Sequence, residues 1–177
     1  MAARRSARST LVLLALVCTL PVVASYVAYY FWRPSDQVNY GELIPLTPMP
    51  APVVSKVPEV RGRWTLVYAS DGACDAACEQ ALYYMRQVRT AQGEHMDRVE
   101  RLWLRTGDQP PREGLLAEHD GLIVADVDAG ALSGLPGFER VLLLDPLGNL
   151  MMKFPADPDP KRMIRDLGRL LKYSQTG

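Results

Sequence analysis

The apolar positions of the chain form one long uncharged run, followed after a proline-rich stretch by shorter runs with strand or helix spacing. Residues 11–32 (LVLLALVCTLPVVASYVAYYFW) contain no charged side chain. At about 1.5 Å per residue, such a helix is about 33 Å long and can cross a hydrocarbon core of about 30 Å. The run therefore predicts a transmembrane helix, and membrane helices tolerate a proline such as Pro21.

The residues that flank this run predict its orientation. Basic residues precede it and aromatic residues close it: Arg4, Arg5 and Arg8 on one side, Tyr29, Tyr30 and Trp32 on the other. Positive charge favours the cytoplasmic side, so we expect residues 1–10 in the cytoplasm and the rest of the chain outside. The alternative is a signal peptide cleaved after Val22–Ala24, but the apolar run continues to residue 32 and favours a retained anchor.

Residues 33–60 differ sharply in composition from what precedes them. Six prolines interrupt any helix or central strand in this stretch: Pro34, Pro45, Pro48, Pro50, Pro52 and Pro58. Such sequences favour extended polyproline II at about 3.1 Å per residue. We therefore expect a semi-rigid linker over residues 33–60 and a folded domain over residues 61–177.

Strand and helix patterns alternate in this domain. Residues 64–70 (WTLVYAS) form an apolar, β-rich run that predicts a buried strand. From Cys74 to Gly93 the spacing is helical, with Cys78, Leu82, Met85 and Val88 on one stripe. Further strands are expected at residues 98–106, 122–127, 141–144 and 150–154, and further helices after Pro111 and after Asp157–Pro160. This order predicts an α/β sandwich with a central mixed sheet.

Composition narrows the functional classes. Lysine plus arginine equals aspartate plus glutamate at 20 each, and the part from residue 61 onward has 15 basic and 17 acidic residues. Nothing here favours a nucleic-acid partner. Of the three cysteines, Cys18 lies in the apolar run, so the chemistry centres on Cys74 and Cys78, spaced C-x3-C.

The position of the pair after a strand and at the start of a helix suggests reactive sulfur. A helix start favours a thiolate at Cys74, and two residues four apart on a helix have Cα atoms about 6 Å apart, within reach of a disulfide. Cys78 shares the buried stripe, so we expect Cys74 to be the exposed, attacking sulfur and Cys78 the shielded one. The negative charges of three nearby acidic residues disfavour a thiolate here, and a bound cation would offset this repulsion. The three residues are Asp71, Asp75 and Glu79.

Other interpretations of the pair stay open at this point. Two thiolates on one helical turn are good ligands for Cu(I). The pair could also be small core residues or a permanent disulfide, although a bridge over three intervening residues removes little chain entropy.

The chain resembles the Sco/SenC family, thioredoxin-fold proteins that help build the binuclear copper centre of cytochrome c oxidase. The shared features are the anchor, the spacer, the strand WTLVYAS, the C-x3-C of Cys74 and Cys78, and the late hairpin LLLDPLGNL. The segment GACDAACEQALYYMRQV is similar to a divergent group of short membrane proteins that accompany bacterial oxidase assembly genes. The resemblance implies a thioredoxin-like fold in the periplasm behind a single-pass anchor in the bacterial inner membrane, with thiol chemistry, copper handling or both.

The chain departs from this family at one ligand. Sco proteins complete their copper site with a histidine that corresponds to the segment Gly137–Arg140, which has none. The two histidines, His95 and His119, are expected to be surface residues at helix ends. Asp157, Asp159 and Asp166 are expected to cap and solvate a helix. Cys74 and Cys78 therefore remain as a candidate two-coordinate Cu(I) site.

Three hypotheses follow. The first is a thiol-disulfide or copper(I) factor that acts on a cytochrome c oxidase subunit or a copper-delivery protein. The second is a general periplasmic thiol-disulfide oxidoreductase, with Cys74 and Cys78 as its catalytic residues. The third is a scaffold with inert cysteines that binds an oxidase subunit.

Overall fold

The computed structural model describes residues 3–31, 39–137 and 139–175, with side chains from residue 8 onward. The chain divides into two compact units, residues 1–38 and 39–177. The first contains α1 (Ala3–Phe31), in which Arg8–Phe31 is long and apolar enough to cross a membrane. Trp32, the last residue of the expected span, lies outside the described residues. The length and the apolar composition of α1 are the features that support a membrane anchor.

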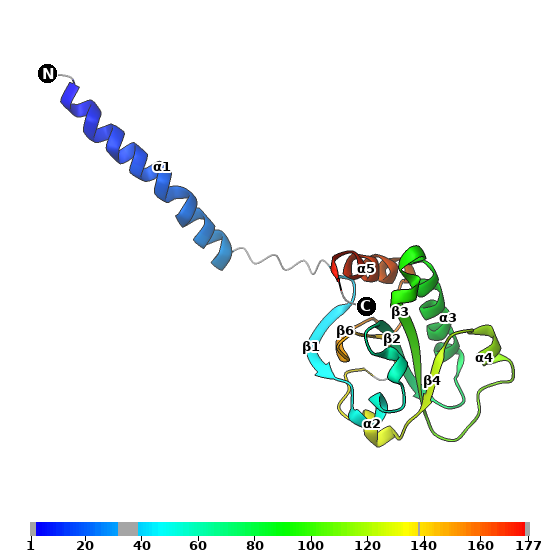
Figure 1. Cartoon of the computed structure of the whole chain (residues 1–177). Helices are drawn as coiled ribbons and strands as arrows, with labels where there is room; N and C mark the ends of the chain where they lie inside the picture. Colours follow the sequence, from blue (N-terminus) through cyan, green and yellow to red (C-terminus); the bar gives the residue numbers. More distant parts are fainter. Residues whose placement is uncertain (1–2, 32–38, 138, 176–177) are drawn as a thin grey trace. The chain divides into compact units, whose positions relative to one another are not determined.

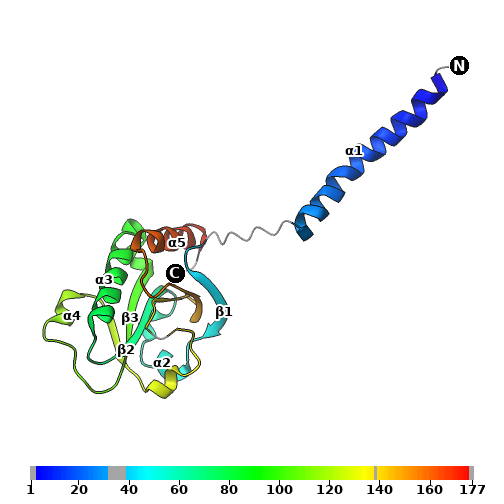
Figure 2. The ribbon, with the colours of Figure 1, turned by 180° about the vertical axis from the view of Figure 1, so that it is seen from behind.

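The second unit is a six-stranded sheet with helices on both faces (Figures 1 and 2). The strands, in sheet order, are β1 (Glu42–Pro48), β6 (Asn149–Lys153), β5 (Leu142–Leu144), β2 (Trp64–Asp71), β3 (Val99–Thr106) and β4 (Ile123–Asp126). The helices are α2 (Ala51–Val54), α3 (Ala76–Thr90), α4 (Leu115–Glu118) and α5 (Pro160–Tyr173), with 3₁₀ turns η1 (Pro58–Val60), η2 (Gly93–Arg98) and η3 (Ala129–Leu132).

The sheet is mixed. β2, β3 and β4 are parallel, whereas β5 is antiparallel to both β2 and β6. The expected tight turn joins β5 to β6, because the Gly148 amide donates to the Asp145 carbonyl oxygen at 3.0 Å. The predicted α/β sandwich with a central mixed sheet is confirmed.

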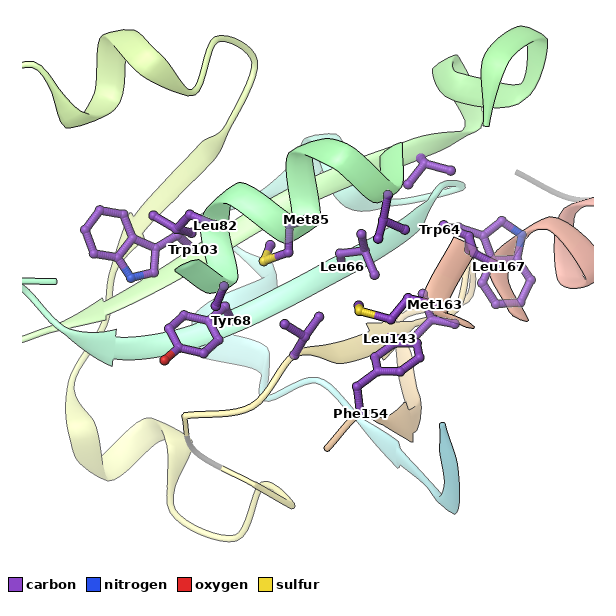
Figure 3. Packing of buried hydrophobic residues seen from close by; sticks show 14 of the residues in the cluster. Trp64, Leu66, Tyr68, Leu82, Met85, Trp103, Leu143, Phe154, Met163 and Leu167 are labelled. Atoms are coloured by element: carbon purple, nitrogen blue, oxygen red, sulfur yellow. The ribbon is translucent and has the colours of Figure 1, made fainter. Parts of the chain in front are cut away.

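Two hydrophobic cores lie on opposite faces of the sheet. On the side of α3 and α5, Leu66, Tyr68 and Trp103 pack against the predicted stripe of α3 and against Met163 and Leu167 of α5 (Figure 3). On the other side, Val67 and Leu104 pack against Val53 of α2. Because β2 is covered on both faces, its sequence is a continuous apolar run instead of an alternating one.

The part of the expected linker that the structure describes is folded. Residues 39–60 belong to the domain, with β1 antiparallel to β6 and with Met49, Val53, Val57 and Val60 buried beneath the sheet. Pro45 and Pro48 fit within β1 because it is an edge strand, whose outer side needs no amide donor, and Pro52 and Pro58 lie in the first turns of α2 and η1. The expected boundary at residue 61 is therefore too late; residues 32–38 lie outside the described residues.

Asp166 of α5 holds the start of this folded segment. Its Oδ2 atom accepts hydrogen bonds from the Tyr40 and Gly41 amides at 2.7 and 2.8 Å, and the residue is only 4% exposed. The expectation that Asp166 is a solvated surface residue is therefore wrong. Asp159, by contrast, caps α5 by accepting from the Lys161 amide, as expected.

Candidate functional site

A tight turn after β2 places the two cysteines. Gly72 lies so close to the loop that follows β3 that a Cβ atom there would be 2.2 Å from the Gln109 carbonyl oxygen. Cys74 has a left-handed backbone (φ 56°) and precedes the helix. Asp75 is the N-cap of α3, and its carboxylate accepts from the Cys78 amide at 2.9 Å. The expectation that Cys74 opens the helix is wrong, since α3 begins at Ala76.

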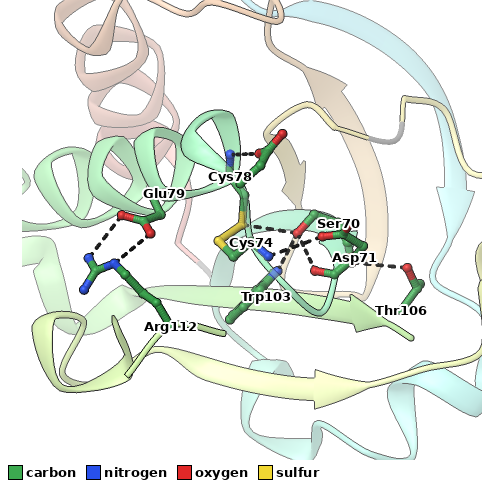
Figure 4. The surroundings of a disulfide bond; sticks show 9 residues. Ser70, Asp71, Cys74, Cys78, Glu79, Trp103, Thr106 and Arg112 are labelled. Carbon is green, nitrogen blue, oxygen red and sulfur yellow. Dashed lines mark hydrogen bonds and ion pairs between the residues drawn. A yellow bond between two sulfur atoms is a disulfide. The ribbon is translucent and has the colours of Figure 1, made fainter. Parts of the chain in front are cut away.

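Cys74 and Cys78 form a disulfide with a Cα–Cα distance of 5.1 Å (Figure 4). Cys74 is 5% exposed and Cys78 is 0% exposed. Both residues are buried in this oxidised state, so the expectation that Cys74 is exposed is wrong here, although Cys78 is the more deeply buried of the two. The left-handed turn at Cys74 brings the two sulfurs together without a full helical turn between them.

A polar side chain lies directly beside the inner sulfur. The Ser70 hydroxyl, from the end of β2, is 3.2 Å from the Cys78 sulfur, and the indole N–H of Trp103 donates to that hydroxyl at 2.9 Å (Figure 4). Trp103 itself is completely buried. A neighbouring strand thus holds the hydroxyl in place against the disulfide.

The acidic residues around the pair all have partners. Asp71 accepts from the Cys74 amide at 3.3 Å, and Asp75 caps the helix as described. Glu79 forms an ion pair with Arg112 at 2.7 Å, and Arg112 also binds Glu118. These ion pairs raise the pKa of Arg112 and lower the pKa of Glu118. Because each of these carboxylates already accepts a hydrogen bond or forms an ion pair, no bound cation is needed to offset their negative charge.

Burial and negative charge keep the nearby Tyr68 phenol neutral. Desolvation, and then Asp75, Glu139 and Asp71, raise the pKa of Tyr68 to about 12. Glu139 belongs to the segment that the Sco resemblance aligns with a copper ligand, and its amide donates to the Ala69 carbonyl oxygen at 3.3 Å. The segment therefore lies beside the end of β2, where such a ligand would be needed, but its described residues offer a carboxylate instead of an imidazole.

His95 lies toward the other end of the sheet. In the parallel pair of β2 and β3, Trp64 faces Val99 and Asp71 faces Thr106, so His95, just before β3, is a strand length away from the disulfide. His119 precedes β4, which is parallel to β3. His119 is also buried, which corrects the expected surface position, and burial with nearby Arg101 lowers its pKa. Within the described residues, no three His, Cys, Asp or Glu side chains cluster as a metal site.

Three residues of this site did not come from sequence reasoning: Ser70, Trp103 and Arg112. For Ser70 a signal existed, because alternation along β2 places Leu66, Tyr68 and Ser70 on the face that α3 covers. Arg112 had no such signal, since it reaches Glu79 from a distant loop.

A disulfide between a strand end and a helix start, in a mixed sheet covered on both faces, defines a thioredoxin-like thiol domain. The chain belongs to the family of transmembrane-like, thioredoxin-like C-terminal domains, whose model matches residues 64–174. The predicted thioredoxin-like fold is thereby confirmed.

Solved Sco structures have the same fold at low sequence identity. Yeast Sco1 is 13% identical, with 78% of this chain and 98% of that chain covered and a TM-score of 0.53. Arabidopsis thaliana ScoI with copper bound is 11% identical (76% and 99% covered, TM-score 0.52), and a SCO1/SenC family lipoprotein of Bacillus anthracis is 14% identical (77% and 98% covered, TM-score 0.50). The resemblance to Sco proteins is thus confirmed for the fold. No curated protein sequence matches the chain.

Proposed function

We propose that the chain is a membrane-anchored thiol-disulfide factor that assists the assembly of cytochrome c oxidase outside the cytoplasm. The observation that carries this proposal is the Cys74–Cys78 disulfide, with a hydroxyl fixed beside its inner sulfur. The engaged acidic residues support redox chemistry over a permanent cation site. The oxidase subunit or copper-delivery protein as partner rests on the resemblance to Sco proteins.

The chemistry is a two-electron exchange with a partner that carries two cysteines. In one direction, the partner's two thiols become a disulfide while Cys74 and Cys78 become thiols, and the two protons move with the electrons. In the other direction, the reduced pair reduces a partner disulfide. Both steps pass through a mixed disulfide.

The experiment is to trap the redox state of the pair in membranes of growing cells with an alkylating reagent. We expect a mixture of oxidised and reduced forms that shifts when the oxidase subunits are deleted. A pair that stays fully oxidised under all conditions, and that resists mild thiols, would leave only a structural disulfide. Full oxidase assembly in a Cys74→Ser/Cys78→Ser double variant would instead support the scaffold hypothesis.

Copper(I) as cargo is the second candidate function. Reduction of the pair yields two thiols four residues apart, and once deprotonated their sulfurs form a donor set that suits two-coordinate Cu(I). Similar folds have been solved with copper bound. We expect the reduced chain to bind one Cu(I), to lose it on Cys74→Ser or Cys78→Ser, and to show no stable Cu(II)–thiolate absorption. His95→Ala should leave binding unchanged, since His95 lies at the opposite end of the sheet.

The general oxidoreductase remains the competing hypothesis for the same cysteines. Turnover on unrelated protein disulfides at a rate equal to that on oxidase subunits would favour it.

The anchor is tested separately: a reporter fused after Gly177 should be active only outside the cytoplasm, and the chain should stay with membranes after carbonate washing. Release of a soluble chain that begins near Ser25 would contradict the anchor.

A further inference from the structure

The Ser70 hydroxyl has two acceptors within reach and one proton to donate. Its oxygen is 3.2 Å from the Cys78 sulfur and also 3.2 Å from the Asp71 carbonyl oxygen. The Trp103 indole N–H occupies one lone pair of the hydroxyl at 2.9 Å. With that lone pair occupied, the hydroxyl acts toward its other two neighbours as a donor.

The redox state of the pair decides which acceptor is the better one. A disulfide sulfur is a weak acceptor, so the Asp71 carbonyl oxygen competes well for the proton in the oxidised chain. A thiolate is a charged and much stronger acceptor. Cys78 is completely buried, so its thiolate loses most of its hydration and depends on a protein donor.

We propose that Ser70, held by Trp103, is a positioning residue that stabilises the Cys78 thiolate and thereby makes Cys78 the leaving group of the exchange reaction. This inference rests on the proposed thiol-disulfide function and names the device inside it. A partner thiolate attacks the Cys74 sulfur and forms a new S–S bond there. The Cys74–Cys78 bond breaks, and its electron pair remains on the Cys78 sulfur, which accepts the Ser70 proton as a hydrogen bond.

The same arrangement directs the attack to one sulfur. Cys74 is the less deeply buried residue of the pair, and stabilisation of the Cys78 thiolate as leaving group speeds the attack on the Cys74 sulfur. Attack on Cys78 would instead leave the charge on Cys74, to which the described Ser70 and Trp103 contacts do not extend. Exposure and leaving-group stabilisation therefore favour the same reaction.

The test uses the full chain in detergent, with Cys18→Ala so that the pair supplies all thiols. In a Cys74→Ser background, Cys78 is the sole thiol and its ionisation is followed by thiolate absorbance against pH. A hydrogen bond to a charged group contributes about 1.5–3 kcal/mol, so Ser70→Ala should raise the pH of half-ionisation by about one unit or more. Ser70→Thr keeps the hydroxyl and should restore the original midpoint.

Two controls separate positioning from general damage. Thr106→Val removes a hydroxyl that donates to the Ser70 backbone carbonyl at 3.2 Å but does not touch sulfur, and it should leave the Cys78 midpoint unchanged. In a Cys78→Ser background, Ser70→Ala should leave the midpoint of Cys74 unchanged. With both cysteines present, Ser70→Ala should also slow the reduction of the disulfide by glutathione several-fold.

An unchanged Cys78 midpoint in Ser70→Ala, or an equal shift of the Cys74 midpoint, would overturn the proposal. These titrations need no partner, so they are independent of the function proposed above. If the pair never changes its redox state in cells, the proposed function fails although the midpoint shift is found. If the pair cycles but the Cys78 midpoint does not move, the role of Ser70 alone fails.

Discussion

Asp166→Ala tests whether a single buried carboxylate holds the start of the folded domain in place. The Tyr40 and Gly41 amides both donate to the same oxygen, at 2.7 and 2.8 Å, and the residue is 4% exposed. Hydrogen bonds to charged groups contribute about 1.5–3 kcal/mol each, and the alanine variant leaves both amides without this acceptor. Allowing for water that reaches the Tyr40 amide, we expect a loss of about 3 kcal/mol in the free energy of unfolding.

The assay is thermal unfolding of the full chain in detergent, followed by tryptophan fluorescence. For a domain of this size, about 3 kcal/mol corresponds to a lower melting temperature by roughly 10 °C. Asp166→Asn should lose about half as much, because its carboxamide oxygen can accept both bonds without the charge. Asp157→Ala, at an exposed neighbouring carboxylate, should stay within about 0.5 kcal/mol of the original chain. A loss below about 1 kcal/mol in Asp166→Ala would refute the argument.

Three further predictions concern ionisation around the sheet. Burial and nearby arginines lower the pKa of His119, so on acidification the histidine of the unfolded chain takes up a proton before that of the folded chain. The free energy of unfolding should therefore fall as the pH drops through about 6.5, and it should fall less in His119→Gln. Urea unfolding on both sides of that pH measures this difference. The pKa of Tyr68 is raised to about 12, so its stabilising contribution is complete below about pH 10 and is lost as the pH rises toward 12. Urea unfolding of the chain and of Tyr68→Phe below and above about pH 10 measures this loss. Arg112→Ala leaves Glu79 unpaired beside Cys78, so reduction of the disulfide by anionic glutathione should slow at low ionic strength and recover at high salt.

The elements predicted from the sequence are those whose signal is local. The strand at residues 64–70 and the stripe of α3 combine strong apolar patterns with clear turns, and both lie where the patterns indicate. β1 was missed because its signal is not local. Leu43 and Leu46 are exposed, two prolines interrupt the run, and only the pairing with β6 makes the segment a strand.

The residues of the site likewise divide into those with a local signal in the sequence and those without one. The C-x3-C spacing and the preceding strand locate the pair, but the helix start depends on Asp75, whose capping role outweighs the apolar spacing that begins at Cys74. The burial of His119 depends on how the segment after α4 packs near Arg101 of β3, and no spacing in the sequence reports that packing. The partner of Glu79, Arg112, and the indole that holds Ser70, Trp103, likewise come from segments far away in the chain.

The folding of residues 39–60 into the sheet decides where a protease could release an intact domain. Cleavage before residue 39 would leave the second unit whole. Cleavage at residue 61 would remove β1 and expose the unpaired edge of β6, together with the apolar face that Val53, Val57 and Val60 cover. An uncovered strand edge beside apolar surface is a template for aggregation. A shed form of this protein that remains soluble must therefore begin no later than about Asn39.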